Sequence, residues 1–213
     1  MGTPFHPPQR VLLGPGPSNV DGRVIEAMTA PILGYLDPVY LECLDAIQGL
    51  LRRVFETANR LTFSISGTGG AGMEACVCSL VDEGDEVVVC SNGFFGARMA
   101  EIVGRWGGKV IRVEAPWGEP IDMERVRRAV RDSSAVAVTM IHAETSTGMR
   151  QPIELLSGLR EIRDLVTIVD TVTSLGAHPV GIDRNGIDAS YSCTQKGIGA
   201  PPGLAPVTFS ERA

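Results

Sequence analysis

Lysine is rare in this sequence, and one of its lysines stands in an unusual place. Of the 19 basic residues only Lys109 and Lys196 are lysines. Lys196 lies in the stretch TQKGIGAPPG, between a strand-like run and a glycine-proline loop. Arginine has the charge of lysine but keeps its proton near neutral pH, so it cannot act as an amine nucleophile. On this stretch alone Lys196 is best interpreted as a solvated surface lysine. Whether it has a chemical role depends on the other polar clusters of the sequence.

The glycine-rich stretch SGTGGAGMEA has the pattern of an anion site. Backbone N–H groups at a glycine turn that opens a helix bind phosphate, and the helix dipole assists them. Gly67, Gly69 and Gly72 also match the G-x-G-x-x-G pattern of dinucleotide folds. Two features disfavour that alternative, because about sixty residues precede the motif and no acidic residue ends the next strand-like run. The stretch supports a phosphate cradle but not a ribose clamp.

Three further residues can serve either the structure or a ligand. Asp170, after the apolar run VTIV, is either a solvated cap or a buried carboxylate opposite a cationic ligand. Phe95 either packs in the core or stacks on a flat ring. Thr145 either caps a turn or presents its hydroxyl to a ligand, and we interpret His142 as structural. A phosphate cradle, an aromatic face, a buried aspartate and one lysine together meet the requirements of pyridoxal phosphate, which favours a chemical role for Lys196.

Composition excludes several classes of function. The 213 residues are 44% hydrophobic and 21% charged, with a net charge of -6, so we expect no nucleic-acid partner. No apolar run reaches the roughly 18 residues of a membrane span, and the opening residues do not resemble a secretion signal. The five scattered cysteines and three histidines do not form a metal pattern, so we expect no metal and a reducing, cytoplasmic location.

Strand-like and helix-like segments alternate strictly from residue 61 onward. Several strands are continuous apolar runs, which is typical of a sheet covered on both faces. We therefore predict an α/β fold, a three-layer α/β/α sandwich with a mainly parallel seven-stranded sheet. Residues 61–213 would form one continuous cofactor-binding domain, and residues 1–60 an N-terminal segment whose helices pack on it. The expected strands are 61–66, 86–90, 109–115, 135–143, 166–172, 189–193 and 205–210; the expected helices are 18–28, 37–55, 70–81, 95–106, 122–130 and 152–165.

Five polar clusters follow predicted strands directly. They are SGTGG, SNGFFG, HAETSTG, DTVTS and TQKG. Ligands of open α/β sheets bind at the carboxyl ends of the strands, where loops and helix N-termini converge. The clusters therefore predict a binding site at that edge.

Seven motifs, in order, resemble those of class V, fold-type I aminotransferases of the alanine–glyoxylate and serine–pyruvate kind. The resemblance runs from about the tenth residue to the last. The motifs are LLGPGPSN, GYLDPVY, SGTGGAGMEA, NGFFGAR, HAETSTG, VDTVTSLG and TQKGIGAPPGLAPVTFSERA.

The resemblance implies a role for each residue of the site. Lys196 would be the Schiff-base lysine of pyridoxal phosphate, and Asp170 the partner of its pyridine nitrogen. Phe95 and Val172 would lie on the two faces of the ring, with Thr145 near its phenolic oxygen. The phosphate would be held by Thr68, Gly69, Gly70 and Gln195.

The resemblance also implies the reaction, a transamination between alanine or serine and glyoxylate or pyruvate by a homodimer. Ureidoglycine–glyoxylate aminotransferases are the close alternative, whereas cysteine desulfurases are disfavoured because glutamine, not histidine, precedes Lys196. The family continues into a small C-terminal domain that supplies an arginine for the substrate carboxylate, and we expect that domain to be absent from this chain. A catalytically incompetent cofactor-binding module and a nicotinamide-dependent oxidoreductase remain as alternatives from other classes.

Overall fold

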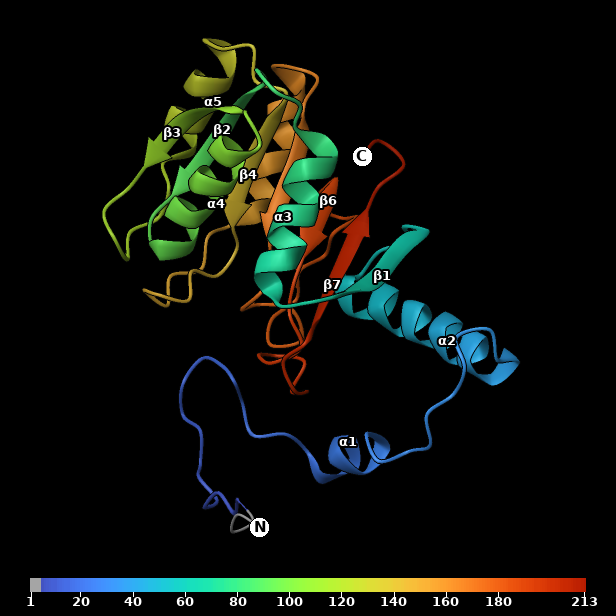
Figure 1. Cartoon of the computed structure of the whole chain (residues 1–213). Helices are drawn as coiled ribbons and strands as arrows, with labels where there is room; N and C mark the ends of the chain where they lie inside the picture. The colour runs from blue at the N-terminus through green and yellow to red at the C-terminus, as the bar shows by residue number, and fades with distance from the viewer. Residues whose placement is uncertain (1–4) are drawn as a thin grey trace.

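A seven-stranded sheet forms the centre of the molecule (Figure 1). The computed structural model describes residues 5–213, so the first four residues of the predicted N-terminal segment lie outside it. The strands are ordered β1-β7-β6-β5-β4-β2-β3. Their bounds are β1 Leu61–Ser66, β2 Glu86–Ser91, β3 Lys109–Glu114, β4 Ala137–Ile141, β5 Val166–Asp170, β6 Ala189–Tyr191 and β7 Leu204–Phe209.

Only β7 runs against the other strands. It pairs antiparallel with both β1 and β6, while the remaining four pairings are parallel. Because β7 is antiparallel to both of its neighbours, β1 and β6 run in the same direction. The carboxyl ends of β1 to β6 therefore share one edge of the sheet, and the expectation of a mainly parallel sheet is confirmed.

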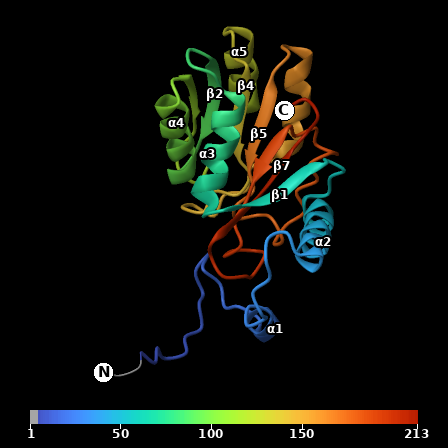
Figure 2. The same cartoon turned by 45° about the vertical axis from the view of Figure 1, so that its right-hand side comes forward.

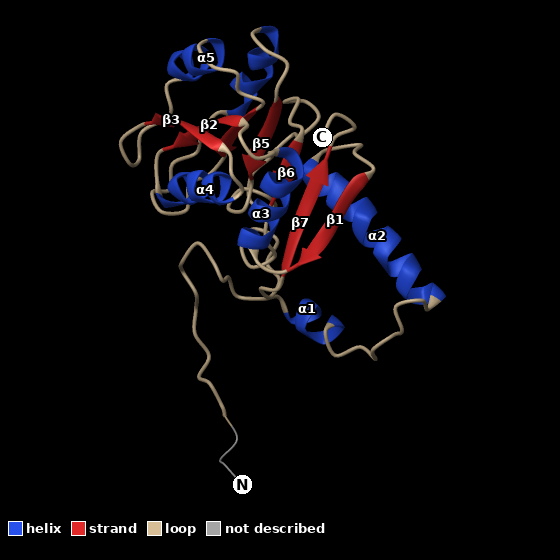
Figure 3. Ribbon diagram, turned by 45° about the horizontal axis from the view of Figure 1, so that its top comes forward, coloured by secondary structure: helices blue, strands red, loops and turns tan. Residues whose placement is uncertain are grey.

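Alternate residues of the central strands pack into two separate hydrophobic cores, one on each face of the sheet. Val88 and Cys90 of β2 pack with the face covered by α5 (Met123–Arg131) and a 3₁₀ helix, η1 (Ile153–Glu161). Val87 and Val89 pack with the opposite face, under α3 (Gly69–Leu80) and α4 (Phe94–Arg105). Figure 2 shows α3 and α4 in front of the sheet, and Figure 3 shows α5 on the other side. The predicted three-layer sandwich is confirmed.

The segment predicted as a helix over 152–165 differs from expectation. It forms η1, which begins directly after Pro152 and contains Gly158. The proline stands at the start of the segment, where a missing N–H costs little, and a mid-segment glycine weakens an α-helix. Short i→i+3 turns still bury Ile153, Leu156 and Leu159, so the apolar pattern is used as predicted.

The N-terminal part of the chain is far more exposed than the sheet. Helix α1 (Gly22–Ala27) contains no buried residue and lies apart from the strands in Figures 1 and 3. Helix α2 (Pro38–Phe55) begins at the predicted Asp37 cap, packs along β1 and β7, and ends on the fully buried Phe55. No helix within residues 5–213 is long and apolar enough to cross a membrane.

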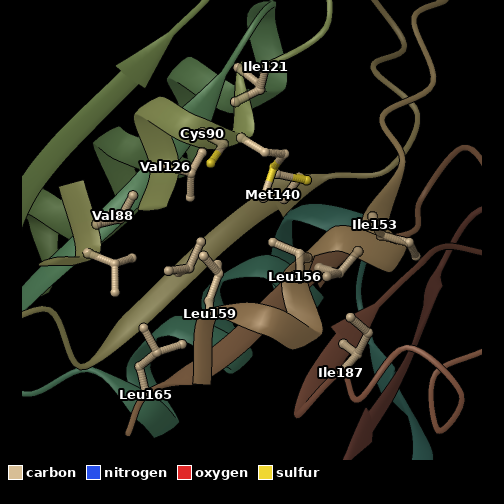
Figure 4. Packing of buried hydrophobic residues seen from close by; sticks show 14 of the residues in the cluster. Val88, Cys90, Ile121, Val126, Met140, Ile153, Leu156, Leu159, Leu165 and Ile187 are labelled. Carbon is tan, nitrogen blue, oxygen red and sulfur yellow. The ribbon is translucent and has the colours of Figure 1, made fainter. Parts of the chain in front are cut away.

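Leu156→Ala tests the packing of η1 under the sheet (Figure 4). Leu156 is fully buried, so its truncation should leave a cavity and lower the free energy of unfolding by about 2–5 kcal/mol. Its neighbour Leu155 is 43% exposed, and Leu155→Ala should cost less than about 1 kcal/mol. Urea unfolding measures both values, and equal losses would contradict the assignment of the buried face.

Candidate active site

A pocket opens at the shared carboxyl edge of the strands, with a cavity volume of about 240 Å³. It lies against the N-termini of α3 and α4, the end of β5 and the loop between β6 and β7. Eight of the nine residues singled out in the sequence line it, namely Thr68, Gly69, Gly70, Phe95, Asp170, Val172, Gln195 and Lys196. The ninth, Thr145, is hydrogen-bonded to the amine of Lys196. Residues from five separate stretches of the chain thus meet at one site.

Lys196 is a half-buried, anchored side chain and not a solvated surface lysine. Its Nζ donates hydrogen bonds to Thr145 Oγ1 at 2.6 Å and to Thr173 Oγ1 at 3.2 Å. The same nitrogen lies 5.6 Å from the ring centroid of Phe95. Burial lowers the pKa of Lys196, although the nearby Cys193 and Asp170 raise it. A lowered pKa leaves more of the amine unprotonated near neutral pH, which is the form that attacks carbonyl carbon.

Residues near the N-terminus close over the lysine loop. Ser18 donates from its backbone N–H to the carbonyl of Gln195 at 3.1 Å and from its hydroxyl to the carbonyl of Lys196 at 3.2 Å. A Cβ at Gly16 would lie 2.6 Å from Cγ of Lys196, so only glycine allows this approach. The motif GPGPS therefore helps to fix the lysine side chain from the side opposite the sheet.

Asp170 is a buried carboxylate at the end of β5. One oxygen accepts the backbone N–H of Val172 at 2.8 Å, and the other accepts the hydroxyl of Tyr191 at 2.6 Å. Burial raises the pKa of Asp170 to about 6, although both hydrogen bonds and Lys196 lower it. A cationic N–H group in the pocket would favour the ionised form of this carboxylate.

The N-terminus of α3 has the geometry of a phosphate site. Within residues 5–213 the backbone N–H groups of Gly69 and Gly70 have no acceptor, and Thr68 does not cap the helix with its side chain. Gln195 lines the same pocket, and its side-chain amide carries N–H groups that can donate to a phosphate. A Cβ at Gly69 would lie 2.9 Å from Val172, so glycine is required there. Free donors at a helix N-terminus bind anions.

Three residues of the site were not singled out in the sequence. Tyr191 lies within a short strand of small residues, where nothing marks it as a partner of Asp170. Thr173 lies in the DTVTS cluster, and Glu144 in HAETSTG, so their positions after strands were a usable signal. His142 lies outside the pocket lining, buried beside Ser174, and burial lowers its pKa to about 4, which agrees with a structural role.

The sequence profile of the family described as Aminotransferase class-V matches residues 42–213. The chain belongs to the class V aminotransferase family. The resemblance found in the motifs and the implied cofactor, pyridoxal phosphate, are thereby confirmed. The individual residue roles stay predictions.

This class V aminotransferase chain is similar to proteins with named activities. It is 37% identical to an alanine–glyoxylate aminotransferase of Drosophila melanogaster, over 99% of this chain and 54% of the relative. It is 36% identical to an (S)-ureidoglycine–glyoxylate transaminase of Bacillus subtilis (strain 168), over 96% of this chain and 49% of the relative. A crystal structure of an alanine–glyoxylate aminotransferase from Nostoc sp. superposes with a TM-score of 0.96 at 45% identity, over 100% of this chain and 56% of that one. The chain thus spans about half the length of these relatives.

The residues of this class V aminotransferase fit pyridoxal phosphate. The two unpaired N–H groups of α3 suit a phosphate, the apolar faces of Phe95 and Val172 suit a flat ring, and Asp170 suits a pyridinium N–H. No group of three or more His, Cys, Asp or Glu side chains in the described range is arranged to hold a metal ion.

The raised pKa of Asp170 predicts a pH dependence of stability. Between about pH 4 and 6 the folded chain keeps a proton on Asp170 that the unfolded chain, with the ordinary pKa of 3.8, has released. This contribution is fully present below pH 3.8 and is lost as pH rises through about 6, so the free energy of unfolding falls with a slope of up to about 1.4 kcal/mol per pH unit.

Asp170→Asn should remove this component of the slope. Urea unfolding at several pH values from 4 to 7, without added cofactor, measures it in both proteins. Because slopes are compared, any constant loss of stability in the variant cancels. Identical pH dependences would show that Asp170 ionises in the folded chain as it does in the unfolded one.

Proposed function

We propose that this chain is the cofactor-binding part of an enzyme that transfers an amino group between alanine or serine and glyoxylate or pyruvate. The observation that carries the proposal is the convergence of the Lys196 amine, the Asp170 carboxylate and the unpaired N–H groups of α3 in one pocket. The similar proteins named as alanine–glyoxylate aminotransferases support glyoxylate as an acceptor.

When bound, pyridoxal phosphate supplies an aldehyde carbon that takes up amino groups and a ring that accepts electrons from the substrate. Lys196 Nζ would supply the amine that holds this aldehyde carbon in the pocket until a substrate amine takes its place. In its unprotonated form Nζ would accept the proton released from the substrate Cα as a general base, and once protonated it would donate that proton as a general acid. The hydroxyls of Thr145 and Thr173 hold Nζ in place for this transfer.

The ionised carboxylate of Asp170 would stabilise a proton on the pyridine nitrogen, because opposite charges attract strongly at a site that excludes water. Tyr191 and the backbone of Val172 hold the carboxylate in position. The unpaired N–H groups of Gly69 and Gly70 would hold the phosphate of the cofactor. These residues would thus fix the cofactor relative to Lys196, and such orientation is a large part of catalysis.

The donor remains the open part of the proposal, with (S)-ureidoglycine as the alternative to alanine and serine. The similarity to the Bacillus subtilis transaminase favours keeping this second candidate. Turnover of glyoxylate with each of the three donors, measured on a version of the protein that carries the C-terminal domain, distinguishes them. An NADH-binding protein without a borohydride-reducible adduct would instead indicate an oxidoreductase, and an adduct without any turnover would indicate a binding module.

We also propose that the chain works as a homodimer in a reducing, cytoplasmic compartment. Several large apolar side chains of the N-terminal segment are exposed, including Leu13, Ile32, Tyr35 and Leu36. Exposed apolar side chains of this size are available for contact with a second chain. All five cysteines are free, which fits a reducing compartment. Analytical ultracentrifugation tests the dimer.

Substituting Lys196 should abolish covalent attachment of the cofactor. Lys196→Arg keeps the charge but removes the amine nucleophile, so treatment with pyridoxal phosphate and borohydride should leave no reduced adduct by mass spectrometry. Lys109→Arg is the matched control, since Lys109 begins β3 away from the pocket and should leave one adduct per chain. A stoichiometric adduct in Lys196→Arg would show that Lys196 is not the residue to which the cofactor is attached.

Asp170→Asn should impair turnover far more than cofactor binding. The neutral amide cannot stabilise a protonated pyridine nitrogen, so we expect turnover to fall about 100-fold or more. The phosphate anchors at α3 are unchanged, and the dissociation constant of pyridoxal phosphate should rise less than the turnover falls. Full activity in Asp170→Asn would show that another group performs this role.

A further inference from the structure

A second buried carboxylate, Glu144, lies between two walls of the pocket. It belongs to the loop after β4 and is 1% exposed. Its Oε2 accepts the backbone N–H groups of Phe95 at 3.0 Å and Gly96 at 3.2 Å. Its Oε1 accepts the backbone N–H of Ser146 at 3.1 Å and the hydroxyl of Ser146 at 2.7 Å. The hydroxyl oxygen of Ser146 in turn accepts the N–H of Phe94 at 3.0 Å.

The first three N–H groups of α4 are therefore bound by side chains of another loop. The residue at the N-cap of α4 is Gly93, which has no side chain to cap the helix. A Cβ at Gly93 would lie 2.6 Å from Cδ of Glu144 and 2.7 Å from Oγ of Ser146. Glycine is thus required so that the Glu144 carboxylate can reach the helix end. A carboxylate at this end also interacts favourably with the helix dipole.

The two segments that Glu144 joins both contact Lys196. The first turn of α4 carries Phe95, whose ring centroid lies 5.6 Å from Nζ. The loop carries Thr145, next to Glu144, whose hydroxyl lies 2.6 Å from the same nitrogen. A shift of the loop relative to α4 would change both contacts. One carboxylate consequently sets the spacing of an aromatic wall and a hydroxyl on two sides of the lysine amine.

We propose that Glu144 is a positioning residue, which holds Phe95 and Thr145 in register and so sets the orientation of the cofactor ring toward Lys196. The inference rests on the proposed function, because it requires pyridoxal phosphate in this pocket. A helix cap alone would affect only the stability of the fold. A positioning residue must also affect the geometry of the bound cofactor, and that difference is measurable without turnover.

The test compares Glu144→Gln with the unaltered full chain. Glutamine has nearly the same size, but its amide NH₂ cannot accept hydrogen bonds, so contact with either Ser146 or the α4 N–H groups is lost. Pyridoxal phosphate is titrated into each protein, and the visible circular dichroism per bound cofactor reports the orientation of the ring. We expect the dissociation constant to rise about tenfold and the circular dichroism per bound cofactor to fall by at least about half. Borohydride should still trap an adduct at Lys196.

Two further variants complete the test. Ser146→Ala removes the hydroxyl that donates to Glu144 and accepts the N–H of Phe94, but it keeps the carboxylate and its bonds to Phe95 and Gly96, so it should shift both measurements in the same direction by smaller amounts. If Glu144→Gln does not fold, Ser146→Ala alone tests the positioning role. Glu83→Gln alters an exposed carboxylate near Gly107, away from the pocket, and should match the unaltered chain.

The outcomes separate this inference from the function on which it rests. If the unaltered chain forms no adduct, the proposed function fails and the positioning role fails with it. If it forms one, but the folded variants keep the same dissociation constant and circular dichroism per bound cofactor, only the positioning role is overturned. If Glu144→Gln lowers the free energy of unfolding but leaves the circular dichroism per bound cofactor unchanged, Glu144 acts only as a helix cap.

Discussion

The burial of Asp170 is the constraint on which the rest of the site depends. An ionised carboxylate loses its hydration inside a protein, and only hydrogen bonds and opposite charge compensate for that loss. Tyr191 and the N–H of Val172 provide two hydrogen bonds, and Lys196 provides the charge, yet the pKa of Asp170 is still raised to about 6. The carboxylate is thus incompletely compensated by the protein. A bound pyridinium would supply the missing compensation for the charge of Asp170. The buried carboxylate that destabilises the free chain would therefore favour binding of the cofactor.

The topology of the sheet places the partners of Asp170 around it. Tyr191 ends β6, the strand paired in parallel with β5, and the register sets Tyr191 directly beside Asp170. The chain then turns through the loop that carries Lys196 and returns along the antiparallel β7. Because β7 runs in reverse, the lysine loop stays at the carboxyl edge of the sheet. A parallel β7 would require a crossover that carries the chain away from that edge.

Glycines without special backbone angles are as important here as those in turns. Gly69 lets α3 approach Val172, and Gly93 leaves room for the carboxylate of Glu144. In both cases a helix N-terminus meets another loop more closely than any side chain would permit. One of these helix ends keeps its N–H groups free for an anion, whereas the other has them satisfied by Glu144 and Ser146. The two helix ends at the pocket therefore differ, because one has unpaired N–H groups and the other has its N–H groups satisfied by a neighbouring loop.

The sequence by itself determined the layers of the fold and the edge at which the site forms, because apolar periodicity and glycine-rich turns are local patterns. It also marked Lys196, since an amine among arginines is visible without coordinates. Only the tertiary structure decided that Tyr191 bonds Asp170, that Ser18 closes over the lysine loop, and that Glu144 caps α4 in place of Gly93. Each of these contacts joins residues far apart in the chain. Their geometry depends on strand register and loop packing, which no local pattern of residues specifies.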